Sequence, residues 1–74
     1  MNGNQSYIIK HLHIMFIRHA EFDGKITRKD LLAILCQRLG KLDYESKEGI
    51  IGELKQSGVI IGETHAGYII NKQL

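Results

Sequence analysis

The hydrophobic spacing of the chain changes at Gly58, and this change restricts the possible folds more than any other feature. Before Gly58, apolar side chains recur at helical intervals at Ile50, Ile51 and Leu54. After it, the short runs VII and YII are rich in β-branched residues and are separated by GETHAG, a pattern typical of a β-hairpin. We therefore expect a helix that ends at Gly58 and leads directly into a two-stranded hairpin.

Two more helices are predicted upstream. Residues 6–20 place apolar side chains on one helical face, and Ser6 is a suitable N-cap for them. In TRKDLLAILCQRLG, Thr27 can cap a second helix, Asp30 stands at the capping-box position, and Gly40 suits the end. The segment FDGKIT between these helices reads as a turn followed by a short extended piece at Lys25–Ile26.

The third helix has a start signal of its own, because Asp43 is a good N-cap ahead of the apolar positions. The inward faces of the three helices and the hairpin predict a single core. Its expected members are Ile8, Leu12, Phe16, Leu31, Leu35, Ile50, Leu54, Ile60 and Ile69.

The chain has 74 residues, enough for one domain only, with a core over about residues 6–72 and a disordered N-terminus at 1–5. The single cysteine, Cys36, excludes an internal disulfide and makes the reducing cytoplasm the expected compartment. No apolar run approaches the roughly 20 residues of a membrane span, so no membrane association is expected.

The order of these elements resembles the winged helix-turn-helix superfamily, an α+β fold with three helices and a C-terminal hairpin wing. The matching segments are ITRKDLLAIL as second helix, YESKEGIIGELKQSG as third helix and VIIGETHAGYII as wing. The wing resembles that of biotin-repressor-type DNA-binding domains. The resemblance implies a third helix in the major groove of DNA and a wing on a neighbouring groove or on the backbone.

The charges divide unevenly along the chain. Residues 1–42 contain seven Lys or Arg against three Asp or Glu, and residues 43–74 contain three against five. Because DNA binding depends largely on cations that neutralise phosphates, the candidate DNA contacts are mostly basic or polar residues near the second and third helices and the wing tip. They are Lys25, Arg28, Lys29, Lys41, Tyr44, Ser46, Lys47, Thr64 and His65.

The outward face of the third helix is acidic, with Glu45 and Glu48 beside two glycines, Gly49 and Gly52. The carboxylates stabilise the N-terminus of the helix through its dipole but repel phosphate. The glycines indicate tolerated sequence drift, close helix–helix packing, or a flat face that another backbone can approach. This surface is therefore a candidate contact for a protein partner.

Tyr7, Ile14 and Ile17 lie on the side of the first helix away from its expected core face. Exposed apolar rows commonly mark contacts with partners, and two-fold dimers are the commonest soluble oligomers. We expect a homodimer through this row.

Catalysis is not expected. His11 and His13 are two residues apart and cannot chelate one ion as an i, i+4 pair on a helix can, and neither a Gly-rich phosphate loop nor a nucleophile motif occurs. The sequence thus predicts no enzyme, no metal and no cofactor. Two hypotheses remain: a dimeric regulator of transcription or replication that binds double-stranded DNA, or an adaptor that binds protein through the acidic third helix and binds no DNA.

Overall fold

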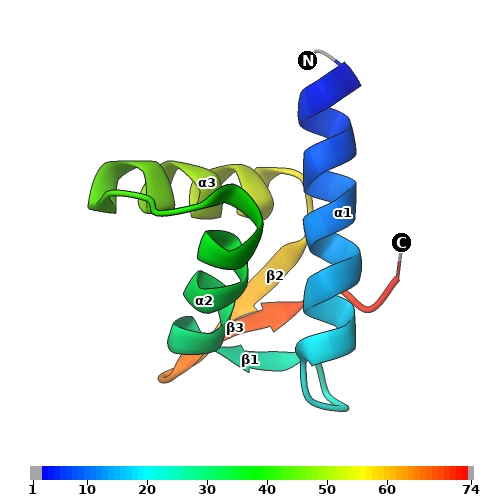
Figure 1. Ribbon diagram of the computed structural model, residues 1–74. Coiled ribbons are helices and arrows are strands. Elements are labelled where there is room, and N and C mark those ends of the chain that lie inside the picture. Colours follow the sequence, from blue (N-terminus) through cyan, green and yellow to red (C-terminus); the bar gives the residue numbers. More distant parts are fainter. Residues whose placement is uncertain (1–2, 74) are drawn as a thin grey trace.

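The structure, a computed structural model, describes residues 3–73 and contains three helices and a three-stranded sheet (Figure 1). The chain order is helix, strand, two helices and two strands, with the helix-turn-helix order and C-terminal hairpin of a winged helix. The elements are α1 (Gly3–His19), β1 (Lys25–Thr27), α2 (Arg28–Leu39), α3 (Tyr44–Gln56), β2 (Ile60–Glu63) and β3 (Gly67–Ile70). The α+β fold class expected from the sequence is confirmed.

The sheet is antiparallel throughout, with β3 in the centre between β1 and β2. The extended piece predicted at Lys25–Ile26 is strand β1, which adds a third strand to the hairpin. Lys25 pairs with Ile69, and Thr27 pairs with Gly67. The pairing of β2 with β3 is irregular between Ile60 and Gly62. Strand β1 therefore joins the hairpin to the rest of the domain, along the edge of β3 that faces away from β2.

The caps of α2 and α3 are confirmed. The Thr27 hydroxyl accepts the N–H of Asp30 at 3.1 Å, and the Asp43 carboxylate accepts the N–H of Ser46 at 2.7 Å. The expected cap at Ser6 is wrong, because α1 already begins at Gly3. Residues 3–5 of the N-terminus expected to be disordered are thus helical, and residues 1–2 lie outside the described residues.

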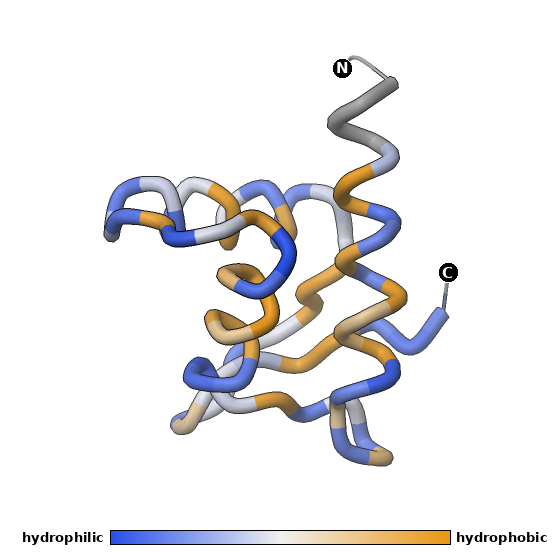
Figure 2. Tube along the Cα trace, viewed as in Figure 1, coloured by the Kyte–Doolittle hydropathy of each residue, from blue (hydrophilic) through white to orange (hydrophobic). Residues whose placement is uncertain are grey.

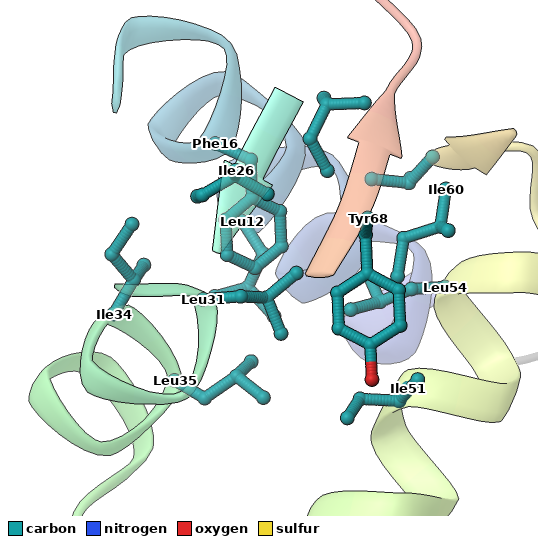
Figure 3. Packing of buried hydrophobic residues seen from close by; sticks show 12 residues of the cluster. Leu12, Phe16, Ile26, Leu31, Ile34, Leu35, Ile51, Leu54, Ile60 and Tyr68 are labelled. Atoms are coloured by element: carbon teal, nitrogen blue, oxygen red, sulfur yellow. The ribbon is translucent and has the colours of Figure 1, made fainter. Parts of the chain in front are cut away.

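The core lies where α1, α2, α3 and the inner face of the sheet meet, and the hydrophobic positions gather there (Figures 2 and 3). Most of its predicted members are buried, including Leu12, Phe16 and Leu35. Two predictions are wrong, because Ile8 is 42% exposed and Ile69 is half-buried, whereas Ile70 is buried. Ile50 is half-buried and packs against the core, and its neighbour Ile51 is buried.

Candidate nucleic-acid interface

Helix α3 buries Ile51 and Leu54 and turns its other side outward, away from the sheet (Figure 1). The backbone hydrogen bond from Ser46 is the main reason why the pKa of Asp43 lies below its ordinary value. The charged Asp43 carboxylate thus holds the first turn of α3 in place. The residues of α3 that remain exposed are Tyr44, Glu45, Ser46, Gly49, Gly52, Glu53, Lys55 and Gln56.

Arg28, expected to contact phosphate, is paired within the domain, although its side chain is 40% exposed. Its guanidinium donates to the Tyr68 hydroxyl and forms an ion pair with the Glu48 carboxylate. The hydrogen bond to Glu48 is the main cause that raises the pKa of Arg28 above its ordinary value. The contact joins the start of α2, the middle of α3 and strand β3. It pairs one of the cations predicted to contact DNA with one carboxylate on α3.

The wing tip is closed by internal hydrogen bonds. The Thr64 hydroxyl accepts the N–H of Gly67 at 2.9 Å, and the N–H of Thr64 donates to the carbonyl of Gly67 at 2.9 Å. The carbonyl of Ala66 accepts the N–H of Arg28 at 3.0 Å and so fixes the tip against the start of α2. Thr64 is therefore a turn residue, and His65 is the exposed side chain that the tip offers to a ligand.

Next to the tip, Lys55 of α3 forms an ion pair with Glu63, the last residue of β2. The side-chain hydrogen bond to Glu63 is the main cause that raises the pKa of Lys55. The same ammonium group lies 5.9 Å from the centroid of the Tyr68 ring. The end of α3 is thereby tied to the wing by contacts that the sequence did not predict.

The other cations predicted to contact DNA have fewer partners within the domain. Lys25 lies 3.5 Å from the Asp23 carboxylate, with both side chains more than half exposed, and the backbone N–H of Lys25 is the main reason why the pKa of Asp23 is lowered. Lys29 and Lys41 are exposed and Lys47 is half-buried, and none of the three forms a salt bridge within residues 3–73.

The predicted dimer row on α1 is not a row of exposed side chains. Tyr7 is 74% exposed, but Ile14 is half-buried and Ile17 packs against the core. The chain that follows β3 passes beside α1, where Lys72 donates to the Ile17 carbonyl at 3.5 Å. The His13 ring donates to the Asn71 carbonyl at 2.6 Å on this path.

Within the described part of the chain, no group of three or more His, Cys, Asp or Glu is placed to hold a metal ion. Cys36 is a half-buried free thiol. No helix within residues 3–73 combines the length and apolarity needed to cross a bilayer.

Comparison of the chain with protein-family models, with curated proteins and with solved structures found no match. The fold alone therefore defines the class: an α+β domain with helix-turn-helix order and a C-terminal hairpin, consistent with a winged helix. Any function must be argued from the placement of its own side chains.

Proposed function

We propose that this chain binds duplex DNA as a small cytoplasmic winged-helix regulator of transcription or replication. The observation that supports the proposal is the exposed outward face of α3. Lysines that form no salt bridge among the described residues lie towards both ends of the neighbouring helix α2. Lys41 and Lys47 flank the start of α3, and Lys29 stands in the first turn of α2.

The spacing of these lysines supports contact with both strands of a duplex. Helix α2 has 12 residues, and at 1.5 Å per residue this corresponds to a length of roughly 18 Å. The major groove is about 12 Å wide. Lysines near the two ends of α2 can therefore reach the two backbones that border a groove occupied by α3.

The outward face of α3 has less uncompensated negative charge than the sequence alone indicates, so it is less unfavourable for DNA binding. The ion pair with Arg28 neutralises Glu48, and the Asp43 carboxylate is turned to the backbone of its own helix. Glu45 and Glu53 remain exposed and without a salt bridge among the described residues. In this proposal Tyr44 and Ser46, both exposed on the first turn, approach the bases or the sugar.

Salt-dependent binding to random-sequence duplex DNA tests the proposal. Lys29→Ala, Lys41→Ala and Lys47→Ala should each weaken binding to all sequences alike. Each should also reduce the magnitude of the slope of log K against log salt by about one. Lys72→Ala is the matched control, because Lys72 is exposed beside α1, away from α3. An unchanged slope in the triple lysine variant would refute DNA binding through this surface.

The second candidate function, a protein adaptor, is favoured by one specific observation. A side chain added at Gly49 or Gly52 would meet nothing within 4 Å, so these glycines do not serve helix packing inside the domain. With Glu45 and Glu53 they form a flat acidic face that suits a basic partner helix. Binding of a cationic amphipathic peptide, lost in Gly52→Arg and retained in Lys29→Ala, would support this function in place of DNA binding.

A further inference from the structure

The turn between α1 and β1 presents a fully exposed aromatic ring. Phe22 is 99% exposed, and it lies between two acidic residues, Glu21 and Asp23. We call residues 21–23 the Phe22 turn. Exposing a whole phenyl ring to water is unfavourable, and nothing within the domain requires it.

The Phe22 turn is held in one shape by hydrogen bonds. The N–H of Glu21 donates to the carbonyl of Lys25 at 2.9 Å, and the N–H of Gly24 donates to the carbonyl of Glu21 at 2.8 Å. The carbonyl of Gly24 accepts the N–H of Ile70 at 2.7 Å, which fixes the turn to the end of β3. The backbone that supports the exposed ring is therefore already ordered, and little backbone entropy would be lost if the ring entered a partner.

A pocket of about 150 Å³ lies between the first half of α1 and the end of α2. Three of its apolar side chains are exposed: Tyr7 at 74%, Ile8 at 42% and Leu39 at 37%. An apolar cavity of about 150 Å³ is large enough to bind benzene, so a phenyl ring matches this volume. We call it the Tyr7 pocket; its lining residues are Tyr7, Ile8, His11, Leu12, Arg38 and Leu39.

The rim of the Tyr7 pocket is cationic. The Arg38 guanidinium donates to the His11 ring, and Lys10 is exposed on the adjacent turn of α1. Residues 7–19 contain no Asp or Glu. The pocket therefore suits an aromatic side chain with carboxylates on either side of it.

The charges also decide between two ways of pairing two copies. A two-fold axis through this pocket would place Lys10 and Arg38 against the same residues of the other copy, and juxtaposed like charges are costly at an interface. The Phe22 turn offers the opposite sign, although Lys25 offsets part of the charge of Asp23.

The Phe22 turn follows the C-terminal end of α1, in the segment that leads to β1 (Figure 1), whereas Tyr7 and Ile8 of the Tyr7 pocket lie in the first half of α1. From Tyr7 to the end of α1 at His19 there are 12 residue steps, which correspond to roughly 18 Å of helix. The Phe22 turn lies beyond that end, so one copy cannot fill its own pocket. We propose that the chain associates head to tail, with the Phe22 turn of one copy seated in the Tyr7 pocket of the next. Such a contact is heterologous and leaves a free turn and a free pocket at the two ends.

The contact is small compared with the roughly 1,200–2,000 Å² buried by stable interfaces. It is therefore weak between free copies, and it strengthens when copies are held side by side on one ligand, where the effective concentration is high. The proposal does not depend on what that ligand is, and its test contains no DNA.

Complementation between two defective variants tests the proposal. Phe22→Ser removes the ring and keeps the pocket, whereas Tyr7→Ser with Leu39→Ser removes pocket walls and keeps the ring. An ¹⁵N-labelled Phe22→Ser chain is titrated with the unlabelled pocket variant up to about 1 mM, the upper range of weak association. We expect saturable shifts of the amide resonances around Tyr7, Arg38 and Leu39.

The matched control is the same labelled chain titrated with unlabelled Phe22→Ser, which should produce no shift. No shift in the complementing mixture, or equal shifts in the control, would overturn the proposal. A charge exchange gives independent evidence: Arg38→Glu in the labelled Phe22→Ser chain should weaken the complementing association at least several-fold, and Glu21→Lys in the unlabelled pocket variant should restore part of it. Failure of the exchange to restore association would also count against the proposal. The thermal unfolding of Phe22→Ser should match that of the natural chain, since the ring is exposed.

Discussion

Glycine has opposite roles in two regions of this molecule: the junction of β1, β3 and the start of α2, and the outer face of α3. At the junction, a side chain on Gly67 would lie 2.2 Å from the carbonyl oxygen of Ile26 and 2.6 Å from the backbone nitrogen of Arg28. On the outer face of α3, side chains added at Gly49 or Gly52 would meet nothing within 4 Å. The first position requires glycine for the fold, and the other two do not.

The polar side chains differ in the same way. Around the junction, the Arg28 guanidinium, the Tyr68 hydroxyl and the Thr64 hydroxyl all have partners within the domain. Among the side chains that the structure describes, in residues 7–73, no buried nitrogen or oxygen is left unpaired. On the outer face of α3, Glu45 and Glu53 have no salt bridge in that same part of the chain. The stability of the fold therefore explains the residues at the junction, but it does not explain those on the outer face of α3. For this reason both proposed functions use that face.

The largest expected effect concerns the core below the junction. Leu35 is completely buried on α2, so Leu35→Ala removes buried methyl groups and leaves a cavity. We expect a loss of about 2–5 kcal/mol in the free energy of unfolding. Urea denaturation measures it, with Leu39→Ala one turn later as the control, because Leu39 is 37% exposed. Equal losses in the two variants would contradict the assigned core.

The second prediction concerns the junction itself. Gly67→Ala places a methyl group against backbone atoms of β1 and α2 that cannot move without breaking the pairing of Thr27 with Gly67. Overpacking of this kind costs typically about 1–3 kcal/mol and sometimes more. The loss should appear in chemical denaturation and as faster amide exchange at Ile26. A variant as stable as the natural chain would show that the close approach of β1 to β3 is wrong.

The third prediction tests the polar contact between α2, α3 and β3. Arg28→Ala removes an ion pair that is worth about 0.2–1 kcal/mol where side chains are partly exposed. It also leaves the hydroxyl of the buried Tyr68 without this donor, which can cost about 1–3 kcal/mol. Arg28→Ala with Tyr68→Phe should therefore lose less than the sum of the single variants, as a double-mutant cycle measures. Strict additivity would indicate that the contact contributes nothing to stability.

The sequence-based predictions agree with the structure where interactions between residues close in sequence determine the conformation. They differ where packing selects one of two neighbouring residues or where a residue distant in sequence makes the contact. The caps at Thr27 and Asp43 follow from chemistry within three residues. In contrast, Ile50 and Ile51 are both compatible with the inner face of an amphipathic helix, and only packing selects Ile51.

A strand adds a second reason, because side chains alternate between its faces. Burial of Tyr68 places Ile70 inside and leaves Ile69 half-buried, and Tyr68 is held by Arg28, 40 residues earlier in the sequence. The same distant contact gives Arg28, a predicted DNA contact, partners within the domain as well. No local pattern in the sequence reports such a pair.

The smallest expected effect has the opposite sign and concerns the outer face of α3. Gly49→Ala and Gly52→Ala should each stabilise the domain by about 1 kcal/mol, because alanine loses less backbone entropy than glycine in a helix interior and the added methyl group has open space. Urea denaturation of the two single variants and the double variant measures the gain. A loss of stability would mean that this face packs against something within the chain.

The double variant also separates the two proposed functions. DNA binding that depends on Lys29, Lys41 and Lys47 should keep its salt slope, whereas a partner whose backbone approaches the glycines should bind more weakly.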